Sequence, residues 1–540
     1  MSSHRIVRLS PLLVLVLLFA GLTLPLYAQD EGAFSLTIMH TNDTRANHLP
    51  DNAGDGGAAR QATVVREIRQ EVENTLLLDA GGRFTGTLFH RVYAGQDNAQ
   101  IMNALGYDAM TVGNPEFDNG DTILAQFIDA LTFPVLAANI DTSRSNDLAG
   151  KFLPSIVLEL GGQSVGLIGI TTDTTPRYSS PGRELIFAGN YAEIIQNEVD
   201  RLAADGVKIV IVLSYLGYDQ DMAIAPALRG VDVIIGGNTR TLLSNTYDGA
   251  DGPYPTVLAG RDGSTLLVVQ SGGGERGELR YMGRLDVTFD AGGLLTAWGG
   301  DTIFLSRYIT PDPDVAGLVD DLNTQVEIER QRLIRTSDAQ PVMVVNPRNV
   351  QTCRSHECAL GNLVADALRW RTGAEVALIN AGAMRGGLTP GPLERGEVLE
   401  FLPFTNRLTT FDIRGADLLL ALENGVSRVG ESSGTGRFPQ VAGMRYTYDR
   451  SLPVYSRIVS AEILSSDGQS YGPLDPDALY TVVTNDFIRK GGDGYQVFAD
   501  RGIDPADTVI FFDDVFIEYA REHSPLDPHL EERITALTLP

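Results

Sequence analysis

The sequence predicts an α/β protein built as two domains. A chain of 540 residues is too long for a single hydrophobic core and suits two. From Ser35 onward, short apolar runs alternate with amphipathic helical patterns, which is typical of a sheet covered by helices. Near residue 310 the pattern changes to a proline-rich start, Thr310-Pro-Asp-Pro-Asp, followed by a long polar helical run. We therefore expect two α/β domains joined by a helical connector.

The first 28 residues read as a secretory signal peptide. Arg5 and Arg8 precede an apolar run from Pro11 to Leu26, and Ala28 is the small residue that suits cleavage. An uncleaved N-terminal anchor is the alternative interpretation. No later run is long and apolar enough to span a bilayer, so we expect an exported protein, periplasmic or extracellular, without a stable membrane anchor.

The first domain is expected over residues 33–309. Apolar runs that end in polar or Gly-rich turns indicate buried strands, and helical patterns lie between them. The predicted strands are 35–39, 75–78, 109–112, 135–138, 164–170, 208–213 and 232–235, and the predicted helices are 58–73, 96–105, 121–130 and 191–205. Chemistry in α/β folds lies at the C-terminal ends of the strands, so the loops at 40–50, 79–84, 113–118, 214–221 and 236–241 are the ones to inspect.

The connector is expected over residues 310–339, with its helix at 314–334. The second domain then occupies residues 340–540. Helical patterns at 360–371 and 415–428 and strand patterns at 375–379 and 480–484 make it α/β as well.

Two cysteines, Cys353 and Cys358, are the only ones in the chain. Thiols this close in an exported protein favour a disulfide, with two free buried thiols as the alternative. A zinc site is disfavoured because two sulfurs do not complete its coordination.

The formal net charge is −27 and the pI is near 4.6. Such acidity argues against nucleic acid as a partner, because binding to its backbone requires clustered Lys and Arg. It does not argue against a small nucleoside or nucleotide, which needs only one local basic pocket.

Three segments of the second domain are similar to the 5′-nucleotidase family, especially the animal ecto-5′-nucleotidase and its bacterial periplasmic relatives. They are Cys353-Arg-Ser-His-Glu-Cys-Ala-Leu-Gly-Asn-Leu, Asn380-Ala-Gly-Ala-Met-Arg and Asn485-Asp-Phe-Ile-Arg-Lys-Gly-Gly-Asp-Gly-Tyr, with Leu402-Pro-Phe between them. In the first domain, His40-Thr-Asn-Asp, Leu76-Leu-Leu-Asp-Ala-Gly, Tyr107-Asp-Ala-Met-Thr-Val-Gly-Asn and Val231-Asp-Val-Ile-Ile-Gly-Gly resemble the calcineurin-like metallophosphoesterase domain. The resemblance implies that layered α/β fold, followed by a C-terminal nucleoside-binding α/β domain.

The resemblance also implies a complete nucleoside pocket. Phe404 and Phe487 match the family's stacking pair, and a flat base between two rings is bound whatever its identity. The remaining matches are two arginines near phosphate and ribose, the carboxylate that accepts from ribose hydroxyls, and the base-facing amide. These are Arg354, Arg385, Asp493 and Asn380.

The metal site matches the family poorly. Family members hydrolyse a phosphate ester with two divalent metals, Zn, Mn or Co, bridged by an aspartate. Of the aligned ligand positions only Asp43 and Asn114 keep the family's residue, and Asp118 survives beside Pro115, where the family has a catalytic histidine. Asn114 and Asp118 are therefore the residual catalytic residues. The remaining ligand positions are occupied by Arg45, Gly82, Tyr215, Asn238 and Arg240.

Two interpretations of these replacements stay open. Arg45 and Arg240 are candidate phosphate contacts, since guanidinium groups bind phosphate through charged, bidentate hydrogen bonds. Alternatively, the site has drifted and Arg45 simply pairs with Asp43. A single-metal arrangement of Asp43, Asp79 and His48 is a further option.

Three functions follow from the sequence. The first is an exported protein that binds a nucleoside or nucleotide and hydrolyses nucleoside 5′-monophosphates weakly or not at all. The second is an active phosphohydrolase with a rearranged or single-metal site. The third, a scaffold that reuses the fold, is disfavoured by the complete nucleoside pocket. In the family the second domain swings about the connector, so the helix at 314–334 is the expected hinge.

Overall fold

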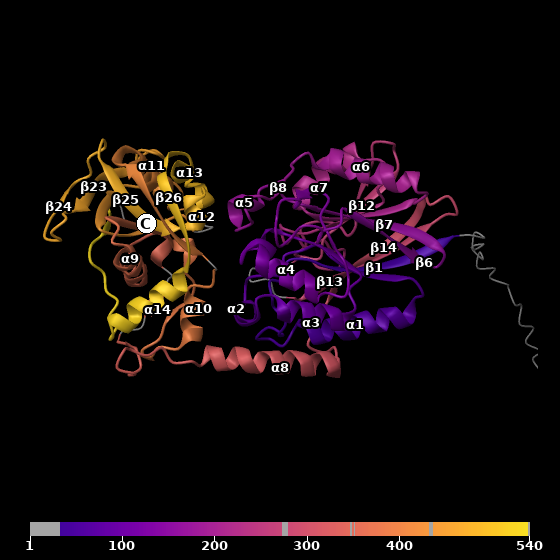
Figure 1. The fold of residues 1–540 in the computed structure, drawn as a ribbon, viewed down its shortest axis with the longest axis horizontal. Helices are drawn as coiled ribbons and strands as arrows, with labels where there is room; N and C mark the ends of the chain where they lie inside the picture. The colour runs from indigo at the N-terminus through magenta and orange to yellow at the C-terminus, as the bar shows by residue number, and fades with distance from the viewer. Residues whose placement is uncertain are drawn as a thin grey trace, which may run out of the picture.

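A computed structural model describes residues 33–272, 279–345, 348–349, 352–404, 406–430 and 436–537. It forms two lobes, an N-terminal one in indigo and magenta and a C-terminal one in orange and yellow (Figure 1). The predicted signal peptide lies outside the described residues. Within them, no helix is both long and apolar enough to cross a membrane.

The N-terminal lobe contains two six-stranded sheets. The first runs in the order β14 (Leu295–Phe304), β13 (Tyr281–Phe289), β1 (Phe34–Thr41), β2 (Thr75–Asp79), β3 (Ala109–Thr111) and β4 (Val135–Leu136). The second runs in the order β11 (Thr256–Ala259), β12 (Thr265–Val269), β10 (Val233–Gly236), β9 (Ile209–Tyr215), β7 (Gln163–Thr171) and β6 (Ser155–Leu160). Strands β1 to β4 are parallel, as are β7, β9, β10 and β12. Their C-terminal ends therefore gather at one edge of each sheet.

The two sheets pack face to face between two layers of helices. Successive residues of a strand point to opposite faces, and β2 shows the consequence. Leu76 and Leu78 lie in the core between the sheets, whereas Leu77 lies in the core under the helices. Helices α1 (Ala58–Glu71), α3 (Gln96–Leu105) and α4 (Asp121–Ala130) cover the first sheet. Helices α6 (Tyr191–Ala204) and α7 (Tyr218–Ile224) cover the second, so the lobe has four layers.

Helix α8 (Pro313–Arg330) connects the lobes along one side of the molecule (Figure 1). It begins at a capped turn, where the Asp312 carboxylate accepts from the backbone N–H groups of Asp314 at 3.0 Å and Val315 at 3.1 Å. Its apolar side chains belong to the helical core of the N-terminal lobe; they are Val315, Val319, Leu322 and Val326. Its far end pairs with the C-terminal lobe through Arg330 and Glu400.

The C-terminal lobe is built on a five-stranded sheet in the order β21 (Pro439–Ala442), β17 (Val376–Asn380), β25 (Leu479–Asn485), β20 (Arg407–Arg414) and β26 (Ile503–Phe511). Helices α9 (Ala359–Thr372), α11 (Gly415–Val426) and α14 (Phe512–Glu522) contribute to its core. A four-stranded sheet lies beside it, in the order β24 (Tyr471–Pro473), β23 (Ile458–Leu464), β22 (Met444–Tyr448) and β27 (Ile534–Ala536).

The predicted α/β class is confirmed, and each strand and helix predicted for the N-terminal domain is present; the helices at 96–105 and 121–130 have the predicted ends, and the other elements differ by one or more residues. The patterns did not reveal the antiparallel edge strands, β13 and β14 on one sheet and β6 and β11 on the other. Strand β14 alternates weakly, with Gly299 and Gly300 at its centre, so its sequence resembles a loop.

Candidate functional site

The loops that follow β1, β2, β3, β9 and β10 meet around one side chain, Tyr215, the last residue of β9. Tyr215 is fully buried. Burial raises the pKa of its phenol well above the ordinary value, so the hydroxyl keeps its proton. That hydroxyl donates to Asp43 Oδ1 at 3.0 Å.

Four glycines make room for the Tyr215 ring. A Cβ atom built on Gly113 would lie 2.5 Å from ring carbons, and one built on Gly82 would lie 2.7 Å from Asp43 Oδ1 and 3.1 Å from the Tyr215 hydroxyl. At Gly81 and Gly237 a Cβ would lie 3.0 and 3.1 Å from the ring. Gly82 also has a φ of 80°, which side-chain-bearing residues rarely adopt. The tyrosine therefore fills the space between these loops.

Asp43 is fully buried and its two oxygens are both engaged. Oδ1 accepts from Tyr215 and lies 3.6 Å from Arg45 Nη2, while Oδ2 accepts from Asn42 Nδ2 at 3.0 Å. Asp43 and Arg45 have φ values of 52° and 54°, in the left-handed region. Residues with a side chain rarely adopt this conformation, so it costs free energy. The predicted ligand is thus held by protein donors.

Arg45 lies at the mouth of this cluster, and its side chain is 18% exposed. Its Nη2 donates to the Tyr215 hydroxyl at 3.2 Å, and its buried Nε has no hydrogen-bond partner among the described residues. Burial opposes its charge, but Tyr215, Asp43 and Asp118 outweigh that effect and raise its pKa above the ordinary value. Arg45 is therefore a cation whose buried Nε has no hydrogen-bond partner among the described residues.

The loop after β3 forms the short 3₁₀ helix Asn114–Phe117, and Glu116 fixes it to the loop after β2. Its carboxylate accepts from the backbone N–H groups of Gly113 at 2.6 Å, Gly82 at 3.1 Å, Arg83 at 2.6 Å and Phe84 at 3.0 Å. Burial raises the pKa of Glu116 to about 7, which the four donors oppose.

Asn114 and Asp118 lie on either side of Glu116 in the sequence, and both are half-buried. Asp118 accepts from the hydroxyls of Thr85 and Ser179. Burial raises its pKa to about 6 against these hydrogen bonds and the charge of Arg45. Asp118 therefore belongs to the same electrostatic cluster as Arg45.

His48 and Asp79, the other residues of the single-metal arrangement, are engaged elsewhere. His48 Nε2 lies 2.7 Å from Asp97, and Asp79 Oδ2 accepts from Arg83 Nη2 at 2.6 Å. Over the described ranges, no group of three or more His, Cys, Asp or Glu side chains is placed to hold a metal ion.

Asn238 and Arg240 follow β10, on the loop beside β9. Both are half-buried and have left-handed backbones, with φ of 75° and 56°. The Asn238 amide donates to the Leu216 carbonyl at 3.4 Å, so it faces the loop that follows Tyr215.

In the C-terminal lobe, Asn380 ends β17 and hydrogen-bonds residues at and beyond the end of β25. Asn380 Nδ2 donates to Asp493 Oδ2 at 2.7 Å, and Asn380 Oδ1 accepts from Asn485 Nδ2 at 2.8 Å. Asn485 also caps helix α12 (Asp486–Arg489) by accepting from Ile488 N at 2.8 Å. The chain of amides orients the carboxylate of Asp493, whose backbone is left-handed with φ 51°.

The two predicted stacking residues are supported differently. The Phe487 ring packs on Gly492, where an added Cβ would lie 2.6 Å from ring carbons. Phe404 is 39% exposed, and the Arg385 guanidinium lies 5.0 Å from its ring centre.

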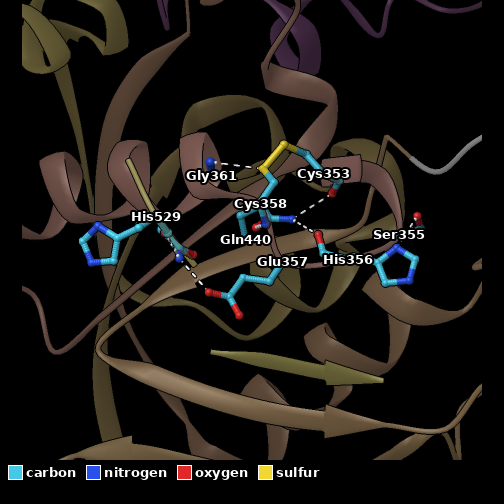
Figure 2. Close-up of a disulfide and its surroundings, with 9 residues drawn as sticks. Cys353, Ser355, His356, Glu357, Cys358, Gly361, Gln440 and His529 are labelled. Carbon is cyan, nitrogen blue, oxygen red and sulfur yellow. Dashed lines mark hydrogen bonds between the residues drawn. A yellow bond between two sulfur atoms is a disulfide. The ribbon is translucent and has the colours of Figure 1, made fainter. Parts of the chain in front are cut away.

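Arg354 is half-buried at the end of the 3₁₀ helix Thr352–Arg354, beside the disulfide Cys353–Cys358 that confirms the predicted pairing. Gln440, fully buried on β21, clamps this loop (Figure 2). Its amide donates to the carbonyls of Cys353 at 2.8 Å and His356 at 2.7 Å and accepts from Cys358 N at 3.1 Å.

The two halves of the site meet across the lobe interface. Arg407 Nη2 donates to the Asp118 carbonyl at 3.1 Å, and the charge of Asp486 raises the pKa of the Asp118 carboxyl. Asp486 directly precedes Phe487. Lys490 Nζ donates to the Ser179 carbonyl at 3.1 Å, and Arg177 donates to the Gly491 carbonyl at 3.2 Å. The predicted nucleoside pocket therefore borders the Tyr215 cluster.

Sequence reasoning missed the supporting residues. Glu116 lies in the predicted loop 113–118 and Asn485 in a quoted motif, but the sequence did not reveal that Glu116 connects two loops or that Asn485 caps a helix. Gln440 and Arg407 lie outside every motif and act over long sequence separations. The sequence places Tyr215 at a ligand position of the family, but its ring fills the space only because four glycines leave room for it.

Comparison with known proteins gives concordant results. The family description "5′-nucleotidase, C-terminal domain" matches residues 334–500. A 5′-nucleotidase of Diplobatis ommata is 32% identical over 533 residues, which cover 93% of this chain and 90% of that protein. The human 5′-nucleotidase is 33% identical over 504 residues, 87% of this chain and 85% of that protein. The crystal structure of a 5′-nucleotidase precursor from Thermus thermophilus has 38% identity and a TM-score of 0.71, over 94% of this chain and 100% of that one.

The fold is that of a two-domain metallophosphoesterase-like protein, with a calcineurin-like N-terminal domain and a nucleotidase C-terminal domain. The chain belongs to the 5′-nucleotidase family.

Proposed function

We propose that this chain is an exported nucleotide-binding member of the 5′-nucleotidase family in which hydrolysis of nucleoside 5′-monophosphates is weak or absent. The C-terminal domain binds the nucleoside, and the former metal region supplies positive charge for the phosphate. The observation that carries this proposal is the position of Tyr215, whose ring fills the space between the strand-end loops and whose hydroxyl donates to Asp43.

The residues around Tyr215 do not fit a dinuclear metal centre. The 5′-nucleotidases are metal-dependent phosphoesterases, and such a centre needs several carboxylate, amide and imidazole ligands with room between them. Here Asp43 is saturated by a phenol and an amide, and Gly82 offers no ligand atom. A cation, Arg45, lies 3.6 Å from the one remaining carboxylate, where it disfavours a metal ion by charge repulsion. We derive no catalytic step through a metal.

Phosphate binding is supported by the exposed part of Arg45. Its side chain is 18% exposed, and a phosphate oxygen at this exposed part would accept charge-assisted hydrogen bonds from the guanidinium group. Arg240 lies on the loop beside β9 and is the second candidate contact. Arg45 and Arg240 are the two cations at the former ligand positions, and phosphate binding would depend on their guanidinium groups.

Nucleoside binding is supported by the C-terminal pocket. All six residues carried over from the family lie in the C-terminal lobe, and Asn380 and Asp493 are already aligned by a 2.7 Å hydrogen bond. The Arg385 guanidinium lies beside the Phe404 ring, and the Phe487 ring packs against Gly492. A base stacked on such rings gains about 1–3 kcal/mol per ring.

An active phosphohydrolase with a rearranged site is the alternative function. Membership of the 5′-nucleotidase family favours this alternative. So does the presence of the family's residues at Asn114 and Asp118, of which Asp118 feels the charge of Arg45.

The two functions separate in one experiment on the purified mature chain. Metal content is measured first, and phosphate release from AMP is then followed in added Zn²⁺, Mn²⁺ or Co²⁺. The proposal predicts less than one equivalent of bound metal and no metal-stimulated release. Robust turnover would instead establish the alternative.

Phosphate recognition is tested by calorimetry with AMP and adenosine. AMP should bind more tightly, and Arg45→Ala and Arg240→Ala should each reduce the preference, while Arg229→Ala, on the far side of the same lobe's sheet, should not. An AMP preference that both site variants leave unchanged would refute the phosphate role of the arginines.

A further inference from the structure

Asp493, the carboxylate expected to face the ribose, is held by two amides from different elements. It lies in the 3₁₀ helix Gly492–Gly494 with a left-handed backbone, φ 51° and ψ 23°. A residue with a side chain keeps this conformation only where its surroundings enforce it. The amide of Asn380 donates to its carboxylate at 2.7 Å. The amide of Asn424, near the end of α11, donates to its backbone carbonyl at 3.2 Å.

Arg437 fixes the orientation of the Asn424 amide. Its Nη1 donates to Asn424 Oδ1 at 3.1 Å and to Ser427 Oγ at 3.2 Å. A guanidinium only donates and a backbone carbonyl only accepts, so the partners of Asn424 allow its amide a single orientation. Asn424 is 4% exposed, and the opposite orientation would leave its buried amide atoms without partners.

The segment that carries Arg437 is also joined to the turn that carries Asp493. Tyr495 is fully buried two residues beyond Asp493, and its hydroxyl donates to the Arg437 carbonyl at 2.6 Å. A Cβ built on Gly494 would lie 2.7 Å from Asn424 Oδ1 and 3.4 Å from the guanidinium carbon of Arg437. The turn therefore packs against both side chains.

This network is separate from the motifs of the pocket. Asn424 and Arg437 lie outside the segments that resemble the family, and Asn424 lies 69 positions from Asp493. Their role is therefore not carried over from the resemblance and follows only from these contacts.

We propose that Asn424 and Arg437 are positioning residues, which hold the Asp493 carboxylate toward the two ribose hydroxyls of a bound nucleoside. This inference rests on the nucleotide-binding function proposed above. Without the Asn424 amide, the backbone of Asp493 loses one of its supports, and its carboxylate accepts less well from the ribose. The stacking of the base on Phe487 does not depend on this network.

The probes are adenosine and 2′,3′-dideoxyadenosine, which has the same base and lacks both ribose hydroxyls. Calorimetry on the mature chain gives a dissociation constant for each. The wild type should bind adenosine at least about tenfold more tightly, because hydrogen bonds to a charged acceptor are strong. Asn424→Ala should reduce this ratio at least about threefold by weakening adenosine binding alone.

Arg437 is tested with the same two ligands. Arg437→Ala should lower the ratio in the same way, because Arg437 acts through Asn424. Arg437→Lys keeps a donor and should retain more of the ratio than Arg437→Ala. Leu420→Ala, on the exposed side of α11, is the control and should leave the ratio unchanged.

A wild-type ratio in Asn424→Ala and Arg437→Ala would overturn the inference. Equal weakening of both ligands would overturn it too, since the two residues would then support the whole pocket and not Asp493. If Asn424→Ala fails to fold, Arg437→Ala gives the answer, because Arg437 is only half-buried. If the wild type binds neither ligand, the proposed function itself is wrong. Equal wild-type affinity for the two ligands would leave nucleoside binding intact and refute the ribose role of Asp493, and the inference with it.

Discussion

At the scale of single residues, Tyr215 determines what the strand-end loops can do. Its ring occupies the space that Gly81, Gly82, Gly113 and Gly237 leave open, and its hydroxyl gives Asp43 a neutral donor. One large aromatic residue thus packs the space between these loops, beside the buried carboxylates of Asp43 and Glu116.

Removing only the Tyr215 hydroxyl tests this role. Tyr215→Phe keeps the ring but leaves Asp43 Oδ1 with Arg45 alone, at 3.6 Å. Because a buried charged acceptor loses a donor, the free energy of unfolding should fall by about 1–3 kcal/mol in urea denaturation. Tyr308→Phe is the control, since Tyr308 is 89% exposed and should show no change. An unaltered urea midpoint in Tyr215→Phe would mean that Asp43 does not depend on this bond.

The stacking role of Phe487 gives a second residue-scale prediction. A base stacked on an aromatic ring gains about 1–3 kcal/mol, so Phe487→Ala should weaken adenosine binding roughly ten- to hundredfold. Calorimetry measures the change, and Phe304→Ala, on the 42%-exposed Phe304 of the other lobe, is the matched control. Equal adenosine affinities in the two variants would show that Phe487 does not stack on the base.

At the scale of elements, the strands and helices were largely predictable, because apolar runs such as Leu76–Leu78 identify buried strands locally. The arrangement of the side chains in the site was less predictable from the sequence. The contact between Asn380 and Asp493 spans 113 positions, and the hydrogen bond of Tyr215 to Asp43 spans 172. Motifs located these residues, but only the fold determines which of them meet and whether a tyrosine fills the space between them.

The Arg354 loop depends on a clamp from another element. Gln440→Ala would remove three hydrogen bonds that hold the segment from Cys353 to Cys358. We expect a loss of about 2–4 kcal/mol in unfolding free energy, since the three backbone groups would be left buried. AMP binding should weaken as well, because Arg354 would lose its fixed position. Gln469→Ala, on the exposed β23–β24 turn, should do neither.

Helix α7 is joined to strand β9 by a carboxyl group that should be neutral at physiological pH. Asp221 accepts from Ser214 Oγ at 2.5 Å and its Oδ2 is buried without a partner in the described chain. Burial raises its pKa from 3.8 to about 8. Between these values the folded state holds a proton that the unfolded state has released, so stability falls as pH rises from about 4 to about 8.

Asp221→Asn should remove this contribution, which amounts to at most about 1.4 kcal/mol per pH unit. The variant should match the wild type near pH 4 and exceed its unfolding free energy near pH 8. Urea denaturation across the range measures this, with the exposed Asp219→Asn on the same helix as control. Parallel pH profiles for wild type and Asp221→Asn would show that Asp221 ionises normally.

At the scale of the whole molecule, the two lobes are held together by polar contacts around the site. Arg91 pairs with Asp513 and lies 3.5 Å from Asp514, and its guanidinium lies 4.3 Å from the centre of the Phe511 ring. Arg177, Arg407 and Lys490 add hydrogen bonds to backbone carbonyls across the interface. The apolar face of α8 packs on the N-terminal lobe, so a change in lobe orientation would occur beyond this helix, near Arg330.

Removing Arg91 should therefore open the molecule. Arg91→Ala should increase the radius of gyration in small-angle scattering, and saturating AMP should restore the wild-type value if nucleotide binds between the lobes. Arg201→Ala, which breaks a surface pair within the N-terminal lobe, should leave the radius unchanged. If Arg91→Ala scatters like the wild type, this contact does not hold the lobes together.

We propose that the chain binds a nucleotide in a site whose metal region is packed by Tyr215. The most direct measurement is to incubate AMP with the mature chain, first stripped of metal and then supplied with Zn²⁺, Mn²⁺ or Co²⁺, while following both binding and the fate of the nucleotide. The account predicts saturable AMP binding that is independent of metal and full recovery of intact AMP. Metal-dependent release of phosphate, abolished by Asp43→Asn, would contradict it.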